Sequence, residues 1–193
     1  AFGDRTITEL YQKHSYPFGI MVNLDGNRYV DEGADFRNYT YVTYGRELLN
    51  QPQGLGFQIF DDKVKHLLRD EYRISQVTMA EANTIEELAT RLDINPQGLI
   101  HTIQEYNAAV QEGTFDPTGR DGLSTRGLEP PKTNWARPIA EPPFYGYSLR
   151  PGVTFTYLGL KVDETARVSG PDGRYANIWA AGEMMAGAIL GQG

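Results

Sequence analysis

The chain of 193 residues contains no cysteine, and this absence removes several functions at once. Disulfide bonds, zinc sites built on thiolates and cysteine nucleophiles are all excluded. Long apolar runs are also missing, since no stretch approaches the roughly 20 residues that cross a bilayer. The formal net charge of −7 argues against a nucleic-acid surface, which needs clustered positive charge. An anionic substrate therefore requires a local cluster of Arg, Lys or His.

The usual nucleotide-binding motifs are absent too. The dinucleotide fingerprint requires a strand, then Gly-x-Gly-x-x-Gly, then a helix. Gly54-Leu55-Gly56 precedes a predicted strand instead of following one, so we interpret it as a turn. No P-loop occurs, and Asp116, Asp121 and Glu129 lack the spacing of metal ligands. The sequence predicts no metal site.

What the sequence does contain is an α+β pattern. Asp25-Gly26 predicts a hairpin turn between strands 18–23 and 28–32. Thr84 with Glu87 forms a capping box, and Asn95-Pro96 begins a second helix. The other expected elements are helix 38–49, strand 56–60, a helix capped by Asp61 and reaching 68, strand 77–80, helices 84–92 and 96–113, and strands 144–149, 155–162 and 177–183.

Two irregular regions complete the pattern. Residues 114–143 are rich in Gly, Pro, Asp and Arg and predict a long loop of the kind that is usually functional or mobile. Pro171-Asp172-Gly173 predicts a turn over 168–174, and a helix is expected from Met184 onward.

Three motifs in order resemble the fumarate reductase and succinate dehydrogenase flavoprotein family. They are Gly-Asn-Arg-Tyr-Val-Asp-Glu at 26–32 followed by Arg37, the segment 151–163, and Ala-Ala-Gly-Glu at 180–183. The resemblance implies a clamp (capping) domain over 1–155 and a β-rich C-terminal piece of the FAD domain over 156–193. In the family, the clamp closes over a flavin and its arginine moves the substrate proton.

A narrower resemblance is to the FAD-dependent tricarballylate dehydrogenases, which oxidise tricarballylate to cis-aconitate. It rests on the segments 13–23, 32–41 and 131–136. It implies FAD as cofactor, a small tricarboxylate as substrate, and a membrane-associated redox partner that reoxidises the flavin. The expected location is the cytoplasm, at the inner face of the membrane through that partner.

The resemblance also implies roles for individual residues. Arg37 is the expected proton-transfer group, and His14 is the more ordinary acid or base because its unperturbed pKa lies near neutrality. Guanidinium and hydroxyl groups suit substrate carboxylates. The expected substrate-binding residues are Arg150, Thr154, Thr156 and Tyr157, and the expected cofactor-binding residues are Gly159, Ala181, Gly182, Glu183 and Gly187.

The chain departs from the family pattern in three places. Arg37 stands five residues after Glu32, where the family has four. The family's His-Thr-Met-Gly-Gly loop reads Phe-Thr-Tyr-Leu-Gly at 155–159, without the histidine. A second substrate arginine would fall near Gly193, where no Arg stands. Arg150 and His14 are therefore the candidate replacements.

Three alternatives stay open. The chain can belong to a fumarate reductase or a ketosteroid dehydrogenase of the same superfamily. It can also be an isolated capping module without activity, because the Gly-x-Gly-x-x-Gly half is absent. We expect the chain to be a piece of a longer protein, since Ala1 is not preceded by Met.

Overall fold

The computed structural model describes residues 12–74, 77–152 and 158–185. The chain divides into two compact units, Ala1–Pro151 and Gly152–Gly193. Within the described ranges, no helix combines the length and apolar character that a bilayer crossing requires.

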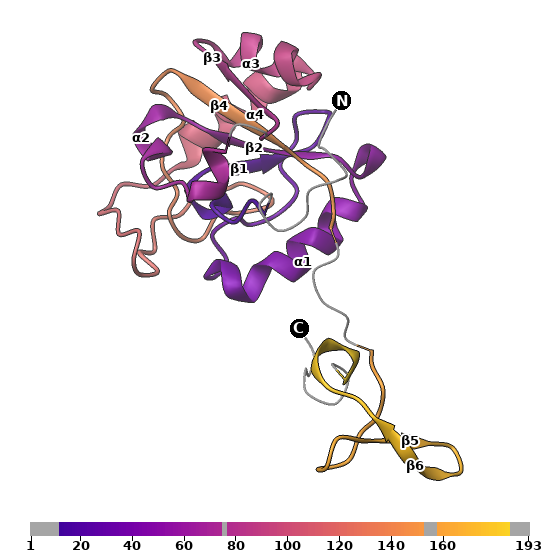
Figure 1. Cartoon of the computed structure of the whole chain (residues 1–193). Helices are drawn as coiled ribbons and strands as arrows, with labels where there is room; N and C mark the ends of the chain where they lie inside the picture. Colours follow the sequence, from indigo (N-terminus) through magenta and orange to yellow (C-terminus); the bar gives the residue numbers. More distant parts are fainter. Residues whose placement is uncertain (1–11, 75–76, 153–157, 186–193) are drawn as a thin grey trace. The chain divides into compact units, whose positions relative to one another are not determined.

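The first unit is built on a four-stranded antiparallel sheet with the order β1-β2-β4-β3 (Figure 1). Ile20 of β1 lies opposite Ile59 of β2, and Ile59 lies opposite Gly146 of β4. The strands are β1 (Ile20–Val22), β2 (Gly56–Phe60), β3 (Met79–Ala82) and β4 (Phe144–Leu149).

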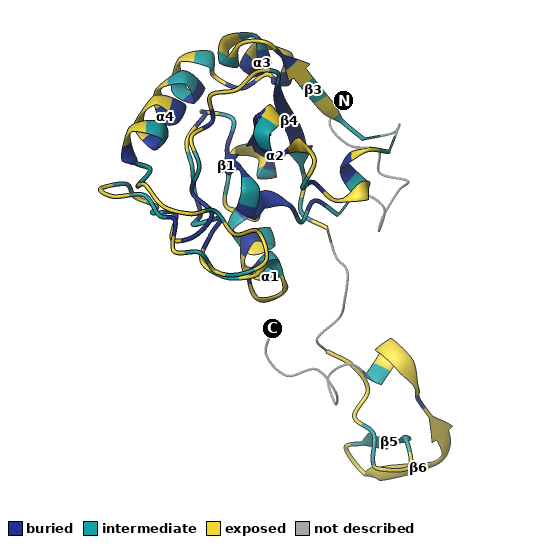
Figure 2. Cartoon of the chain, turned by 90° about the vertical axis from the view of Figure 1, so that its left-hand side faces the viewer, coloured by how far each residue is buried: buried dark blue, intermediate teal, exposed yellow. Residues whose placement is uncertain are grey.

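Side chains alternate between the two faces of this sheet, as the pleat of a β-strand requires. Phe57 and Ile59 of β2 enter one core cluster, in which Leu88, Leu92 and Leu99 of two helices cover the sheet. These helices are α3 (Ile85–Leu92) and α4 (Pro96–Ala109). Figure 2 shows their buried residues along one side and their exposed residues along the other.

Both helices begin where the sequence predicts, and the caps are those expected. The Thr84 hydroxyl accepts a hydrogen bond from the Glu87 N–H. The Asn95 side chain accepts from the N–H groups of Gln97 and Gly98. Each bond satisfies a backbone donor that the first helical turn leaves without a partner.

The opposite face of the sheet carries aromatic and polar residues. Phe60, Tyr145 and Tyr147 pack there with Tyr72, and Met21 packs with Tyr16 and Tyr44 in a separate cluster. The elements concerned are α1 (Arg37–Leu49), α2 (Asp62–Lys65) and short 3-10 helices at Tyr16–Phe18, Pro52–Gly54 and Asp70–Tyr72.

Four sequence expectations for the first unit are wrong. Residues 28–32 do not form a strand, because only Arg28 bridges to Val22 and β1 pairs with β2 instead. Helix α2 ends at Lys65, and α4 ends at Ala109. Asp61 does not cap α2 through its side chain; its Oδ2 accepts from the N–H groups of Ala140 and Glu141.

The second unit contains a hairpin of β5 (Arg167–Gly170) and β6 (Gly173–Trp179), followed by a 3-10 turn at Gly182–Met185. The predicted turn over 168–174 is therefore too long, and the predicted strand 177–183 ends at Trp179. Residues 158–161 are not in a strand, and 153–157 of the strand expected at 155–162 lie outside the described residues.

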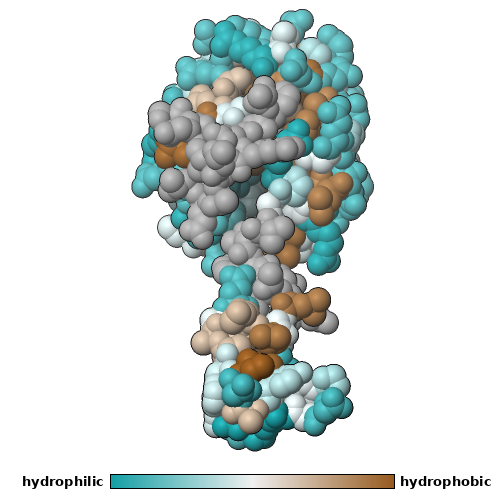
Figure 3. All heavy atoms as spheres, turned by 45° about the vertical axis from the view of Figure 1, so that its right-hand side comes forward, coloured by the Kyte–Doolittle hydropathy of each residue, from teal (hydrophilic) through white to brown (hydrophobic). Residues whose placement is uncertain are grey.

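Apolar side chains of the second unit lie on its surface. The whole of β6 is exposed, and Leu158 is 90% exposed. Figure 3 shows brown, hydrophobic atoms on this unit. The other large apolar side chains exposed in this unit are Leu160, Tyr175, Ile178, Trp179 and Met184. This hairpin therefore buries little of its own apolar surface.

Candidate active site

The first unit contains a pocket of about 250 Å³ in which His14 and Arg37 meet. Five separate stretches of the sequence form its wall. The lining residues are His14, Ser15, Pro17, Phe18, Phe36, Arg37, Asn38, Arg69, Pro117 and Trp135. We call it the His14 pocket.

Arg37 reaches this pocket because it is the first residue of α1. The Tyr16 hydroxyl lies 3.3 Å from the Arg37 carbonyl oxygen, to which it donates, and 2.7 Å from the Thr40 hydroxyl. The turn before the helix is packed against the long loop. A Cβ added at Gly33 would lie 2.2 Å from the Asn134 carbonyl oxygen, so only glycine fits there. The helix start is thus fixed at both sides.

The Arg37 guanidinium and the His14 imidazole are in hydrogen-bond contact. Arg37 Nη1 lies 3.0 Å from His14 Nδ1. A guanidinium can only donate, so Nδ1 of His14 accepts and the proton of the neutral ring is on Nε2. Burial and, after it, the charge of Arg37 lower the pKa of His14 to about 4. His14 is therefore neutral near pH 7.

Positive charge dominates the polar side of the pocket. Besides Arg37, the pocket is lined by Arg69, whose guanidinium pairs with the Glu71 carboxylate at 3.1 Å. The side chain of Arg69 remains 45% exposed. Two guanidinium groups beside one carboxylate leave a net positive site that suits a carboxylate ligand.

Aromatic side chains also line the pocket. The ring centroids of Phe36 and Trp135 are 5.7 Å apart, and Phe18 lies 6.1 Å from Phe115. Trp135 is buried, and its indole N–H donates to the carbonyl oxygens of Asp116 and Gly119. A pocket lined by both aromatic rings and two cations is typical of sites that hold an anion by its head and shield its carbon atoms from water.

A buried ionic cluster lies behind the pocket wall. Arg28 pairs with Glu32 at 2.6 Å, and Lys132 Nζ lies 4.0 Å from the same carboxylate. Lys132 Nζ also donates to the carbonyl oxygens of Pro17 and Gly19 at 2.7 and 2.6 Å. The Arg and Glu of the motif at 26–32 thus link the segment before Arg37 to the long loop and to the pocket wall.

The structure brings together two of the predicted site residues, Arg37 and His14. Arg150 follows β4, is exposed and does not line the His14 pocket. Gly159, Ala181, Gly182 and Glu183 are exposed residues of the second unit. Four further predicted residues lie outside the described residues, namely Thr154, Thr156, Tyr157 and Gly187.

Sequence reasoning missed Arg69 and Phe36 as site residues. Arg69 lies 32 positions after Arg37 in a charged stretch, so no local pattern singles it out. Phe36 stands next to Arg37 and falls within the segment 32–41 that carries the family resemblance. Phe36 directly precedes the helix that begins with Arg37, the expected catalytic residue, and this position could have indicated that Phe36 lies in the site.

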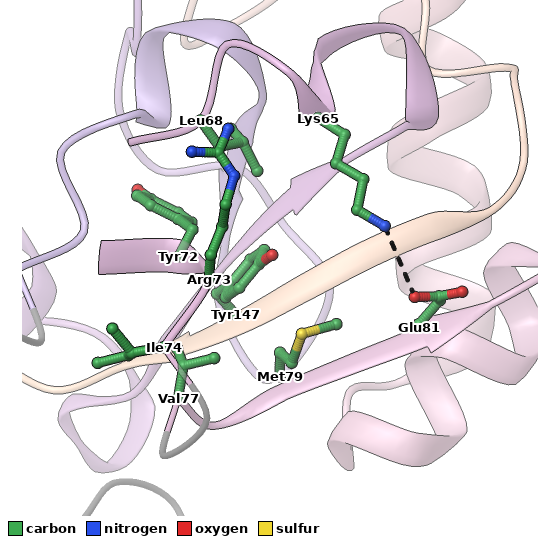
Figure 4. Close-up of a pocket in the computed structure, with 9 residues that line it drawn as sticks. All are labelled: Lys65, Leu68, Tyr72, Arg73, Ile74, Val77, Met79, Glu81 and Tyr147. Carbon is green, nitrogen blue, oxygen red and sulfur yellow. Dashed lines mark ion pairs between the residues drawn. The ribbon is translucent and has the colours of Figure 1, made fainter. Parts of the chain in front are cut away.

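A second pocket of about 270 Å³ opens beside β3 and β4 (Figure 4). Its wall is mostly apolar, with Tyr72 and Tyr147 in edge-to-face contact at 4.9 Å. Lys65 and Glu81 lie 4.0 Å apart at its edge. The residues that line this pocket include no histidine and one arginine, Arg73, so it lacks the arginine–histidine contact of the His14 pocket. Over the described ranges, no group of His, Cys, Asp and Glu is arranged to hold a metal ion.

Residues 5–191 match the family model described as FAD binding domain. The chain belongs to this family. Its curated relatives are flavoprotein oxidoreductases of the fumarate reductase and ketosteroid dehydrogenase type. The chain is 31% identical to the NADH:acrylate oxidoreductase of Vibrio harveyi, with 89% of the chain and 16% of the relative covered. It is 28% identical to the NADH:fumarate oxidoreductase of Klebsiella pneumoniae, with 87% and 17% covered.

Solved structures share the fold of this chain. The open conformation of a flavocytochrome c3 fumarate reductase matches with a TM-score of 0.66 at 22% identity, over 91% of this chain and 29% of that one. The 3-ketosteroid-Δ4-(5α)-dehydrogenase of Rhodococcus jostii matches with a TM-score of 0.55 at 25% identity, over 89% and 33%. The chain spans about a sixth of the length of the two NADH-dependent relatives above.

The cofactor of the family is FAD, and part of the second unit fits it. Gly182 has a φ of +70°, and a Cβ added there would meet no atom within 4 Å, so its backbone is open to a ligand. Glu183 is exposed beside it, and a carboxylate accepts hydrogen bonds from sugar hydroxyls. These residues suit the polyhydroxyl part of FAD, whereas the fingerprint for the pyrophosphate is absent from the sequence.

Proposed function

We propose that this chain is the substrate-capping part and a C-terminal flavin-contacting part of an oxidoreductase acting on a C–C bond next to a carboxylate. The observation that carries this proposal is the contact between Arg37 Nη1 and His14 Nδ1 at 3.0 Å inside a cationic pocket with an aromatic wall. FAD, when bound, takes or gives the hydride, which no side chain can do. The chain's own residues bind the substrate and move the proton.

Arg37 is the proposed proton-transfer group, and His14 is its relay. The guanidinium charge helps to lower the pKa of His14, so the imidazole is neutral while Arg37 is charged. When Arg37 gives a proton to the substrate carbon, that cause disappears and His14 binds protons more readily. His14 then takes a proton from solvent at Nδ1, becomes an imidazolium, and gives this Nδ1 proton to Nη1 of Arg37, which returns the ring to its neutral Nε2–H form. Oxidation of the substrate uses the same path in reverse.

The proposed substrate is tricarballylate, which loses a hydride and a proton to give cis-aconitate. Arg37 and Arg69 supply two guanidinium groups for its carboxylates, and Phe36 with Trp135 covers the carbon chain. We also propose that a membrane-associated redox protein reoxidises the flavin, with the enzyme on the cytoplasmic side of the membrane. These assignments rest on the resemblance of segments 13–23, 32–41 and 131–136.

A second candidate is the reduction of acrylate or fumarate with electrons from NADH. It is favoured by the 31% and 28% identity to two relatives with these activities. In this case a hydride and a proton add across the carbon–carbon double bond, NADH is oxidised, and a saturated carboxylate is released. The roles of Arg37 and His14 are the same in both candidates.

The test uses a protein that joins this chain to a flavin-binding half, with Arg37→Ala as the variant. Dye reduction is measured with tricarballylate, succinate and a 3-oxosteroid, and reduced-dye oxidation with fumarate and acrylate. Turnover of tricarballylate that Arg37→Ala lowers by about 10²–10⁴-fold, with flavin content unchanged, supports the main proposal. Turnover of fumarate or acrylate alone replaces it with the second candidate.

Two outcomes reject both carboxylate candidates. A steroid that is turned over while every carboxylate is inert identifies a ketosteroid dehydrogenase. A flavin-loaded protein that turns over none of the substrates leaves the inactive capping module. The matched control is Arg73→Ala, because Arg73 lines the second pocket and not the His14 pocket.

A further inference from the structure

Below the His14 pocket, two buried side chains hold the backbone on both sides of His14. The Tyr72 hydroxyl accepts a hydrogen bond from the Ser15 N–H at 2.8 Å. It donates its own proton to Gln58 Oε1 at 2.6 Å. Gln58 Nε2 in turn donates to the Lys13 carbonyl oxygen at 2.7 Å. These bonds form one chain of four groups. It runs from the backbone N–H of Ser15, through Tyr72 and Gln58, to the backbone carbonyl of Lys13, so its two ends are the residues on either side of His14.

This arrangement is rigid because each member is buried. Tyr72 is 2% exposed and Gln58 is 1% exposed. Gln58 is held in the middle of β2, where it faces the aromatic side of the sheet next to Phe60. The ring of Tyr72 is packed between Phe60 at 5.8 Å and Tyr147 at 4.9 Å. A polar pair so deep in the fold costs free energy unless all of its hydrogen bonds are made.

The same segment also fixes the second arginine of the pocket. The Ser15 hydroxyl accepts a hydrogen bond from the Arg69 N–H at 3.1 Å. Ser15 is therefore bonded through its N–H to Tyr72 and through its hydroxyl to Arg69. Loss of the bond to Tyr72 frees a segment that carries His14 and anchors Arg69.

We infer that Tyr72 and Gln58 are positioning residues that hold the imidazole of His14 against the guanidinium of Arg37. This inference rests on the proposed function for its catalytic meaning, but the geometry it describes exists without a substrate. Residues 58 and 72 lie 44 and 58 positions from His14 in the sequence. Their role is to restrict the backbone at 13–15 so that Nδ1 of His14 stays at 3.0 Å from Arg37.

The charged groups that face His14 make its titration a sensitive reporter. Arg37 from α1, Arg69 and the neighbouring Lys13 lower its pKa, while Glu71 raises it, and burial is the largest cause of the lowering. The rings of His14 and Tyr41 are 5.3 Å apart. A His14 side chain that moves away from Arg37 into solvent loses both main causes, so its pKa returns toward 6.5.

The first experiment follows the histidine ring signals of the 193-residue chain by NMR as the pH is changed. The chain has three histidines, and His14→Gln assigns the His14 signal while the other two are recorded in the same spectra. In Tyr72→Phe, we expect the pKa of His14 to rise by roughly one unit or more. The Ser15 amide is also expected to exchange with solvent at least about tenfold faster, because its acceptor is gone.

Tyr147→Phe is the matched control. It removes a hydroxyl from the same aromatic cluster, but Tyr147 makes none of the hydrogen bonds to residues 13–15 described above. We expect its His14 titration to equal that of the wild type. Equal titrations in wild type and Tyr72→Phe overturn the inference, and so does a rise of the same size in Tyr147→Phe.

A variant that loses its amide dispersion has not folded, and Gln58→Met then replaces Tyr72→Phe. Gln58→Met removes the bond to Lys13 and is expected to raise the pKa of His14 as well. An unchanged His14 pKa in folded Gln58→Met overturns the inference.

Activity gives the final readout in the flavin-loaded protein. Tyr72→Phe is expected to lower kcat about tenfold because the relay is misplaced, and to raise KM less than Arg69→Ala does because the Arg69 guanidinium is retained. A loss of kcat equal to that of Tyr147→Phe contradicts the positioning role. If the wild type turns over no carboxylate, the proposed function fails, and the NMR result still decides the geometry.

Discussion

Arg28 and Glu32 form a buried ion pair outside any helix, although they stand four residues apart. Arg28 Nη2 lies 2.6 Å from Glu32 Oε2, and Arg28 Nε lies 3.1 Å from Oε1. The side chains are 5% and 0% exposed. Glu32 Oε1 also accepts from the Met21 N–H at 2.7 Å. A turn that buries two charges has to satisfy both of them. Strand β1 supplies a donor to Glu32, and the carbonyl oxygens of Val30, Pro130 and Pro131 accept from Arg28.

Removal of Glu32 is expected to destabilise the first unit strongly. Glu32→Ala leaves Arg28 and Lys132 buried without their carboxylate, which we expect to cost about 3–5 kcal/mol of unfolding free energy. Urea unfolding followed by the fluorescence of buried Trp135 measures it. Asp70→Ala is the control, since Asp70 belongs to the exposed pair with Arg73. An equal shift of the unfolding midpoint in both variants contradicts the prediction.

Replacement by alanine is expected to change the stability in opposite directions at two helical glycines. A Cβ at Gly98 of α4 would lie 1.9 Å from the Asp25 carbonyl oxygen, whereas a Cβ at Gly45 of α1 would meet no atom within 4 Å. Gly98→Ala therefore forces two backbones apart and should cost about 1–3 kcal/mol. Gly45→Ala should stabilise by about 0.5–1 kcal/mol through helix propensity. Thermal unfolding of both variants checks the signs, and a stabilising Gly98→Ala would show that the turn at 24–27 can move.

The sequence predicts most of what local signals determine in this fold. The caps at Thr84 and Asn95, the strand at 56–60 and the long loop before 144 are all confirmed. The hairpin partner of β1 was wrong because the Asp25-Gly26 turn packs against α4 instead. The Asn95 N–H donates to the Leu24 carbonyl oxygen at 2.8 Å. Such a tertiary contact has no signature in the turn itself.

Strand β5 was missed, and β6 (Gly173–Trp179) was predicted only in part, as the strand 177–183, for a different reason. A strand is recognised from alternation between a buried and an exposed face, but every residue of β6 is exposed. In the candidate site, Arg37 and His14 could be named from the family resemblance. Arg69, Tyr72 and Gln58 could not, because their roles come from contacts with residues more than 40 positions away, or from a shared pocket.

Acid is expected to destabilise the chain partly through His14. Its pKa is about 4 in the folded chain, below the ordinary 6.5, mainly because of burial. Between these values the unfolded chain binds a proton that the folded chain does not, so stability falls as the pH is lowered from 6.5 to 4. Above 6.5 the residue contributes no pH dependence.

His14→Gln separates this contribution from that of the carboxylates. Glutamine accepts a hydrogen bond from Arg37 through its amide oxygen but does not titrate. The unfolding free energy of this variant should therefore decline less steeply with acid than that of the wild type. Urea unfolding at several pH values between 4 and 7 gives both slopes, and parallel slopes would mean that His14 is not shielded from solvent.

Arg69 is expected to bind the substrate without taking part in the chemistry. Its guanidinium lines the His14 pocket but contacts Glu71 and not His14 or Arg37. In the flavin-loaded protein, Arg69→Ala should raise KM for the carboxylate substrate about tenfold, with kcat within about twofold, because a bond to a charged group is lost. Glu71→Gln should lower KM, because it removes the carboxylate that pairs with Arg69 and so leaves the Arg69 guanidinium available to bind the substrate.

Salt distinguishes this charge effect from a loss of packing. The side chain of Arg69 is 45% exposed, so its attraction for a carboxylate is screened by ions. The difference in KM between wild type and Arg69→Ala should shrink when the ionic strength rises from about 0.01 M to about 1 M. A difference that does not change with salt would assign the effect to the packing of the Arg69 side chain, because Arg69→Ala keeps the backbone N–H that donates to Ser15.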